Sequence, residues 1–283
     1  MVTPPIGFAS FMPSDDHGLL RRIDAYLDAA PRTGARAEAI GPFTLFLNEG
    51  HGWRYYARPT PDATGFTVGA LRAVRDRQRF LAQPEAFEWI EELAPDVGQA
   101  AMADAMIVVR HPLMVLADEA AAVPIVPAGV EIAIADPEDD LAAISAVAEI
   151  GFSAPGTAGG TLGAVEAAAA AKRQNPDTTA FQRGRMIAGL TIAATARVSG
   201  SIAAVGWHQP LDGGSEIVGV STLPAFRRRG LGAAVTASLV ADAIERGVGT
   251  VFLSADGDDV ARVYARVGFD RVGTAGAASK PKA

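Results

Sequence analysis

At 283 residues, 49% of them hydrophobic, the chain is long enough for two domains that each bury a core. The absence of cysteine excludes disulfides, thiolate metal sites and an acyl-cysteine intermediate, and the net charge of -7 opposes nucleic acid as a partner. No segment reaches the roughly 18 uninterrupted apolar residues of a membrane helix, and the start of the chain does not read as a signal peptide, so we expect a cytoplasmic protein without a membrane partner.

Residues 1–124 are predicted to form a first domain in which strands alternate with short helices. The apolar periodicity predicts helices over 19–30, 68–82 and 96–105, and strands over 42–48, 52–59, 86–93 and 106–117. A boundary is expected near residue 125, because Pro124 and Pro127 interrupt an alanine-rich segment before a new strand begins.

Residues 125–283 are predicted to form a second domain with the same mixture of elements. The pattern predicts helices over 137–152 and 166–174, a helix ending at 246–247 and a short helix from 258, with strands over 130–136, 186–198 and 201–209, from 216, and over 250–256. Glycine, serine, threonine and proline dominate residues 153–163, which predicts a mobile loop, and a second loop is expected over 210–215.

The most informative segment runs from Glu216 to Gly247, where a strand, a basic loop and a helix follow one another without interruption. Arg227, Gly230 and Gly232 give the loop the pattern R-x-x-G-x-G. N–H groups in the first turn of a helix lack intrahelical partners and lie at the positive end of the helix dipole, so the loop suits a pyrophosphate. It is neither G-x-G-x-x-G nor G-x-x-x-x-G-K-[ST], so the dinucleotide and P-loop fingerprints are absent.

Two segments in register resemble the GNAT superfamily of acyl-CoA-dependent N-acyltransferases. They are V-S-T-L-P-A-F-R-R-R-G-L-G-A, over 220–233, and Y-A-R-V-G-F, over 264–269, and the resemblance covers roughly residues 128–275. It implies an α/β (α+β) fold with a mixed, mostly antiparallel sheet flanked by helices. It also implies acetyl-CoA as co-substrate, no metal, and transfer of an acetyl group to the primary amine of a small molecule by direct attack in a ternary complex.

The resemblance also implies roles for individual residues. Main-chain groups of the strand would pair with the pantetheine arm, an N–H near Val220 would polarise the thioester carbonyl, and N–H groups of the loop would hold the pyrophosphate. Tyr264 would protonate the departing thiolate. The implied cofactor-binding positions are Val220, Ser221, Thr222, Arg227, Arg228, Arg229, Gly230, Leu231, Gly232 and Ala233.

Glu216 is the candidate general base. The attacking amine must lose a proton, since an alkylammonium has a pKa of about 10.4. Glu216 lies eleven residues before Arg227, the spacing at which histone-type members of the superfamily look to carry their glutamate base, and its neighbours Ile217 and Val218 are apolar, which would raise its pKa. The alternatives are a charged residue at the solvent end of a strand, or a water relay in place of the glutamate.

The first domain reads as a degenerate relative of the second, as in tandem GNAT proteins with one inactive copy. Setting Asp96 against Asp259 puts Ala101 opposite Tyr264, so the acid is missing there. We expect this domain to form one wall of the acceptor site and to cover a sheet edge. The protein could be a monomer or a homodimer. The alternatives to a small-molecule enzyme are a CoA-binding module without catalysis and an acetyltransferase for protein lysine or N-terminal amines.

Other polar and aromatic residues have simpler interpretations. The four histidines, His17, His51, His111 and His208, have no metal-ligand spacing. His208 is interpreted as a strand-end residue with local hydrogen bonds, with a lining role in the acceptor pocket as the alternative. Trp53 and Tyr55 alternate as core-facing strand residues do, with acceptor stacking as the alternative. The helix face with Arg72, Arg75 and Arg79 is interpreted as solvated surface, with phosphate or nucleic-acid contacts as the alternative.

Overall fold

The computed structural model describes residues 16–48, 50 and 56–281. Within them, the first half of the chain consists of α1 (Asp16–Arg32), β1 (Arg36–Ile40), β2 (Phe43–Leu47), β3 (Ala57–Pro59), α2 (Val68–Phe80), β4 (Ala86–Ile90), α3 (Pro95–Ala103) and β5 (Ile107–Leu116). The second half consists of η1 (Glu119–Ala122), β6 (Val130–Ile134), α4 (Leu141–Phe152), α5 (Ala164–Ala171), α6 (Pro176–Ile187), β7 (Ile192–Val198), β8 (Ser201–Leu211), β9 (Gly214–Thr222), η2 (Pro224–Phe226), α7 (Leu231–Glu245), β10 (Thr250–Ser254), α8 (Asp258–Ala265) and β11 (Phe269–Ser279).

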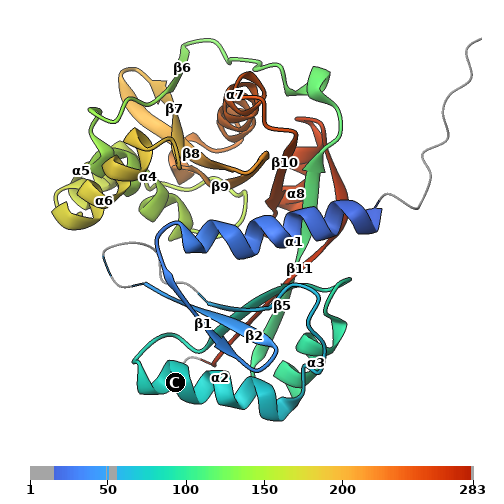
Figure 1. Ribbon diagram of the computed structural model, residues 1–283. Coiled ribbons are helices and arrows are strands. Elements are labelled where there is room, and N and C mark those ends of the chain that lie inside the picture. The colour runs from blue at the N-terminus through green and yellow to red at the C-terminus, as the bar shows by residue number, and fades with distance from the viewer. Residues whose placement is uncertain (1–15, 49, 51–55, 282–283) are drawn as a thin grey trace, which may run out of the picture.

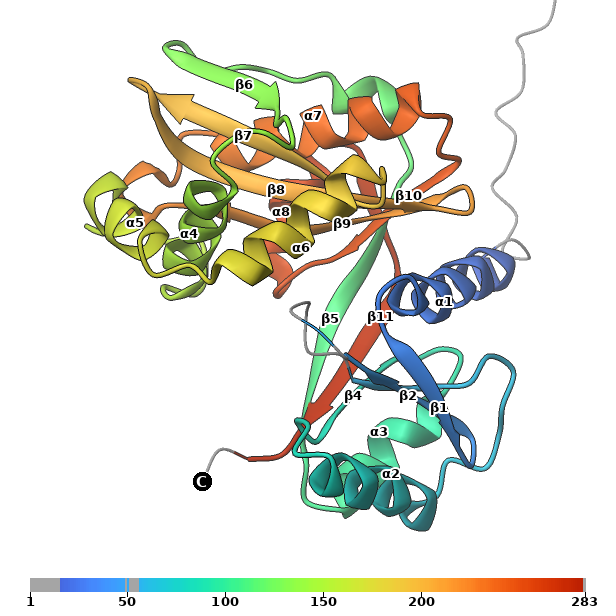
Figure 2. The same cartoon turned by 60° about the vertical axis from the view of Figure 1, so that its left-hand side comes forward.

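All the strands of the described residues join one sheet in the order β1-β2-β3-β4-β11-β5-β10-β9-β8-β7-β6. Only the pairs β3–β4 and β9–β10 are parallel, which confirms the predicted mixed, mostly antiparallel sheet. Two lobes are joined by the long strands β5 and β11, and α1 lies across the junction (Figures 1 and 2).

The two halves share one succession of elements. A parallel pair of strands linked by a helix is followed by a short helix and a long strand, in β3–α2–β4–α3–β5 and again in β9–α7–β10–α8–β11. The long strands are exchanged, since β5 pairs with β10 and β11 pairs with β4. The expected boundary near residue 125 falls in the connection between β5 and β6, whereas the sheet continues across the two halves.

The structure corrects two of the predicted loops and strands. Residues 176–187 form α6, which was not predicted: Asn175 caps it by accepting from the N–H of Asp177, and Pro176 occupies its first turn. The predicted strand over 186–198 therefore begins only at Ile192. The predicted loop over 210–215 is a tight hairpin turn, because Asp212 and Gly213 both have positive φ and so match the twist of the strands.

His208 ties β8 to its neighbours inside the second lobe. Its fully buried ring contacts Ser215 on β9, with 2.9 Å from Nδ1 to Oγ, and Asp242 on α7, with 2.8 Å from Nε2 to Oδ2. Burial lowers the pKa of His208. The ring therefore serves local packing, and Ser215, which is also fully buried, is closed to a substrate.

Replacing His208 with leucine should destabilise the fold by about 2–4 kcal/mol, because the buried Ser215 hydroxyl and the Asp242 carboxylate both lose a partner. Urea unfolding measures the difference. His17→Leu on the exposed surface of α1 is the matched control and should change stability by less than about 0.5 kcal/mol. Equal stability of the two variants would contradict a structural role for the His208 network.

Candidate active site

Strands β9 and β10 run side by side only at their beginnings. The parallel register joins Thr250, Val251 and Phe252 to Gly214, Ser215 and Glu216, and it extends no farther along these described strands. From Ile217 to Thr222, β9 is paired with β8 alone, while β10 turns to β5. The two strands thus part beyond Glu216 and leave an open edge on β9.

A bulge shapes this open edge. The register between β8 and β9 shifts between the pairs Trp207–Val218 and Val205–Ser221, and Gly219 in the bulge has φ +65°. A Cβ at Gly219 would approach the Trp207 ring to 2.7 Å, so no side chain fits at this position.

The main-chain groups of Val220 and Thr222 face away from β8. The N–H of Leu223 donates to the Ala203 carbonyl of β8 at 2.9 Å, and N–H groups of successive strand residues point to opposite sides. An extended ligand could therefore pair with this edge of β9 as an added strand would.

The start of α7 lies beside the open edge. Gly230 precedes the helix in the left-handed conformation, with φ +79°, and the N–H of Ala234 makes the first bond to a carbonyl, that of Gly230. In the described part of the chain, no main-chain N–H from Arg228 to Ala233 has an acceptor. A Cβ at Gly232 would lie 3.6 Å from Thr222 Oγ1 and 3.9 Å from Val220 Cγ1, so this turn of the helix faces the strand edge. The arrangement suits an anion, as the loop sequence predicts.

The arginines of the loop differ in their surroundings. Arg228 and Arg229 are exposed, and Arg229 stacks over the Phe226 ring at 5.6 Å. The guanidinium of Arg227 instead donates to four carbonyl oxygens, those of Gly151 at 2.7 Å, Ala154 at 2.6 Å, Ala158 at 3.0 Å and Thr222 at 3.2 Å. Arg227 was predicted to bind the cofactor; its side chain holds the loop over 153–163 against the end of β9. That loop, predicted to be mobile, is thus bound to the loop that precedes α7.

Tyr264 extends from α8 into the apolar cluster that also contains Leu231 and Leu253, against which Val220 packs. Its ring is 8% exposed and meets Phe269 edge to face at 6.2 Å. Burial raises the pKa of Tyr264 to about 12. With this pKa the hydroxyl keeps its proton through the neutral range. It has no hydrogen-bond partner among the described residues, so its proton is free to be donated.

Glu216 occupies the last position at which β9 and β10 are paired. Its N–H donates to the Tyr26 hydroxyl at 3.3 Å, and that hydroxyl donates to the Gln209 carbonyl at 2.5 Å, so α1 is fixed to the hairpin of β8 and β9. Burial raises the pKa of Glu216 to about 7; the charge of Glu88 adds to the effect and that of Arg58 opposes it. The shift has the predicted direction, but its causes include charges in the first half of the chain.

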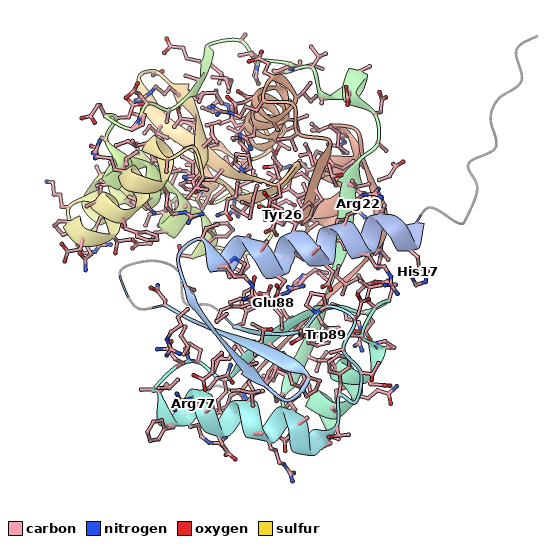
Figure 3. The ribbon with its side chains drawn as sticks, viewed as in Figure 1. His17, Arg22, Tyr26, Arg77, Glu88 and Trp89 are labelled. Carbon is pink, nitrogen blue, oxygen red and sulfur yellow. The ribbon has the colours of Figure 1, made fainter. Side chains whose placement is uncertain are left out.

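Five polar residues of the first half of the chain were missed from the sequence: four of them interact with Glu216, and Asp24 pairs with one of these four, Arg58. They are Asp24 and Tyr26 on α1, Tyr56 and Arg58 around β3, and Glu88 on β4. Figure 3 shows Tyr26 and Glu88 near α1, between the two lobes. For two of them, the sequence carried a signal, which was a charge inside an apolar strand pattern. Arg58 interrupts the end of an aromatic run, and Glu88 lies between Phe87 and Trp89.

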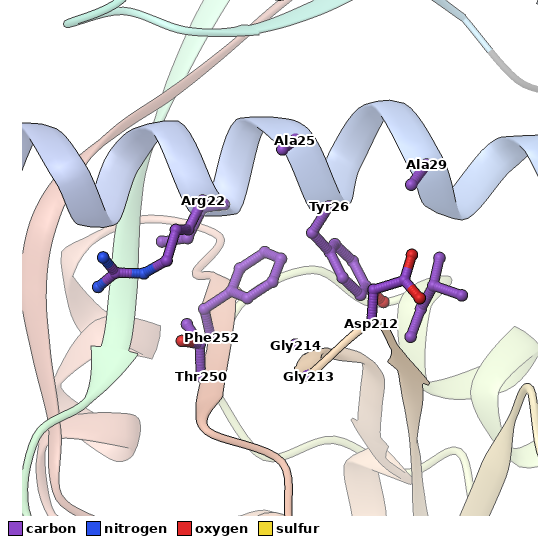
Figure 4. Close-up of a pocket in the computed structure, with 11 residues that line it drawn as sticks. Arg22, Ala25, Tyr26, Ala29, Asp212, Gly213, Gly214, Thr250 and Phe252 are labelled. Carbon is purple, nitrogen blue, oxygen red and sulfur yellow. The ribbon is translucent and has the colours of Figure 1, made fainter.

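A pocket of about 270 Å³ lies between α1 and the turn that joins β8 to β9 (Figure 4). Arg22, Tyr26, Asp212 and Phe252 contribute to its walls. It lies at the beginning of β9, and neither Val220 nor Tyr264 lines it. The pocket thus does not extend along the open edge of β9, although Tyr26 and Phe252 in its walls lie next to Glu216.

The remaining sequence interpretations concern residues away from this site. The three arginines of α2 make ion pairs. Arg72 lies 2.6 Å from Asp104. Arg75 and Arg79 each lie 2.7 Å from Glu85. The interpretations of His51, Trp53 and Tyr55 lie outside the described residues. Over the described residues there is no group of three or more histidine or acidic side chains placed to hold a metal ion. The helices of the same residues are too short or too polar to cross a membrane.

Comparisons with known proteins identify the fold. Residues 196–275 match the family model of FR47-like proteins. A GCN5-related N-acetyltransferase from Kribbella flavida has a TM-score of 0.69 and 24% identity, and the similarity covers 94% of this chain and 96% of that one. The chain has the GNAT fold.

Other solved structures with the GNAT fold extend over both halves. A putative acetyltransferase of the GNAT family from Novosphingobium aromaticivorans has a TM-score of 0.57 and 19% identity, covering 94% of this chain and 100% of that one. A tandem GNAT protein from the clavulanic acid biosynthesis pathway has a TM-score of 0.53 and 16% identity, covering 96% and 98%. No curated protein sequence matches the chain. The predicted resemblance to tandem GNAT proteins is confirmed at the level of the fold.

Replacing Gly232 with valine should weaken binding of CoA by at least about tenfold, because the side chain would fill the space between α7 and the open edge of β9. Titration calorimetry measures the affinity. Gly184→Val on α6, where an added Cβ meets nothing within 4 Å, is the matched control and should leave the affinity unchanged. Unaltered affinity in Gly232→Val would place the phosphates elsewhere.

Proposed function

We propose that the protein is an acetyl-CoA-dependent N-acetyltransferase that transfers an acetyl group to the primary amine of a small molecule by direct attack in a ternary complex. The observation that carries the proposal is the run of N–H groups without acceptors from Arg228 to Ala233, beside the open edge of β9. A helix terminus with free donors and a strand edge whose N–H groups at Val220 and Thr222 face away from β8 together match a ligand that carries a pyrophosphate and an amide-containing arm.

The residues present fit coenzyme A. The N–H groups from Arg228 to Ala233 would hold its pyrophosphate, with the exposed Arg228 and Arg229 adding positive charge, and the edge at Val220 and Thr222 would pair with its arm. When bound, acetyl-CoA supplies an activated acyl group and a thiolate leaving group. Ser221, which was also predicted to bind the arm, is a β8-facing position and contributes by holding β9 in place.

Glu216 would take the proton from the acceptor ammonium. A base with a pKa of about 7 is largely ionised at slightly alkaline pH and still basic enough to accept a proton. The N–H of Val220, which faces away from β8, would donate to the oxygen on which negative charge develops.

Tyr264 would supply the proton to the leaving sulfur. Its pKa of about 12 keeps the phenol protonated, and its hydroxyl is without another partner among the described residues. The site would thus hold a base and an acid whose pKa values are far apart, as general acid–base catalysis needs.

Replacing Glu216 with glutamine should lower kcat/KM for the amine by about 100-fold or more. In the wild type, kcat/KM should rise with pH and level off above about 7, because only the ionised carboxylate accepts a proton. The variant should lose this limb of the profile. Glu131→Gln, on the exposed face of β6, is the control and should keep both rate and profile. A limb that persists in Glu216→Gln would assign the base to another group.

Replacing Tyr264 with phenylalanine should reduce kcat by about tenfold to 100-fold at saturating acetyl-CoA, since the leaving thiolate loses its proton donor. Thiol release measured with a panel of amines gives the rate. Equal turnover would remove Tyr264 from the mechanism, and the absence of thiol release with every amine would favour a CoA-binding module without catalysis.

The same glutamate should make the protein less stable as the pH rises. A carboxyl whose pKa is raised from its ordinary value of 4.5 to about 7 in the folded protein stabilises the fold in its protonated form, and this contribution is lost between those two values. Glu216→Gln should therefore gain stability relative to the wild type between about pH 5 and about pH 8 in urea unfolding. A constant difference over this range would show that the carboxyl is not raised in the folded protein.

A further inference from the structure

The cluster around Glu216 holds three carboxyl groups and one guanidinium. Glu216 comes from β9, Asp24 from α1 and Glu88 from β4, and Arg58 of β3 is 2% exposed in their midst. Two tyrosines also act on these carboxyls: Tyr26 on α1 and Tyr56 just before β3. Asp28 and Asp62 act on Asp24 alone. If the three carboxyls ionise, the single guanidinium leaves two negative charges without compensation.

Arg58 is engaged mainly with Asp24. Its Nη2 donates to Asp24 Oδ1 at 3.2 Å, whereas its Nη1 lies 4.0 Å from Glu88 Oε2, beyond hydrogen-bond distance. Its Nε is buried and has no hydrogen-bond partner among the described residues, so the guanidinium does not complete its bonds within the cluster. The charge of Glu88 is therefore only partly balanced from within the protein.

Glu88 is also the carboxylate with an open side. Its side chain is 39% exposed, compared with 14% for Asp24. Burial raises the pKa of Glu88, Asp24 and Glu216 alike, although the charge of Arg58 opposes the shift in each. The Tyr56 hydroxyl also opposes the rise in the pKa of Glu88.

We propose that Glu88 binds a second ammonium group of the acceptor, so that the substrate class is a primary diamine rather than a monoamine or an amino acid. The inference rests on the proposed function, in which the first amine loses its proton to Glu216. Two carboxylates on one cluster bind a chain with an ammonium group at each end, whereas a carboxylate at the far end meets repulsion from Glu88. The first half of the chain thus supplies a specificity residue to the second.

The wild-type protein tests this without any substitution. Butane-1,4-diamine, 4-aminobutan-1-ol, butylamine and 4-aminobutanoate share a four-carbon spacing and differ only in the group at the far end, and diamines of neighbouring lengths cover the spacing that the site prefers. We expect kcat/KM for the best diamine to exceed that for the alcohol and for butylamine by at least about tenfold, with aminobutanoate the poorest. Equal values for the four acceptors would overturn the proposal.

Glu88→Gln separates charge recognition from folding. On the alkaline plateau of the pH profile, the variant should raise KM for the diamine by about tenfold and leave KM for butylamine unchanged, because only the diamine uses the second carboxylate. Removing a negative charge beside Glu216 should also move the acid limb of the pH profile to lower pH. Glu131→Gln is the matched control. A uniform loss with all acceptors would mean that Glu88 is merely structural and would overturn the proposal.

Calorimetry with the diamine distinguishes failure of this inference from failure of the proposed function. Diamine binding that Glu88→Gln weakens, in a protein that releases no thiol with any amine, would support the diamine site and reject the transferase. Thiol release with amines but no preference for the diamine would support the transferase and reject the diamine site. Absence of both binding and preference would overturn the inference.

Discussion

The arrangement of the candidate site depends on the parting of β9 and β10. Two parallel strands that stayed paired would satisfy each other's main-chain groups and leave no edge for a ligand. Here pairing ends at Glu216 and Phe252, and β10 instead continues with β5. The bulge at Gly219, where no side chain fits beside Trp207, bends β9 at the same place. The open edge of β9 and the position of Glu216 follow from this one departure from regular pairing, and the free N–H groups at the start of α7 lie beside that edge.

The exchange of β5 and β11 explains why the two halves form one site. Each lobe keeps its own apolar cluster, yet β5 of the first half lies beside β10 and β11 of the second half lies beside β4. The strand with Glu88 is therefore held by the last strand of the chain, and α1 is fixed to the β8–β9 hairpin by Tyr26. Residues that are far apart in the sequence thus act on the same carboxylate.

The cluster around Glu216 also shows a conflict between stability and chemistry. Three carboxyls with raised pKa values and a guanidinium with an unpaired Nε would be poor choices for a purely structural interface, where apolar packing is usually at least as stabilising. The His208 network in the same lobe is different, because both ring nitrogens have partners and no open side remains. The incomplete pairing near Glu216 is the feature on which the proposed diamine site rests.

The sequence by itself determined the local features. The loop pattern from Arg227 to Gly232 and the order of strand, loop and helix predicted a turn with unpaired N–H groups before α7, because unpaired N–H groups at a helix start are a property of the nearby chain. The sequence did not reveal α6, whose signal was only an Asn-Pro start. It also did not reveal the hydrogen bonds from Arg227 to four carbonyl oxygens. The tertiary structure alone decided the exchange of β5 and β11 and the approach of Arg58 and Glu88 to Glu216. Periodicity tells which face of a strand is buried but not which distant strand lies beside it, since that choice depends on contacts across the whole sheet.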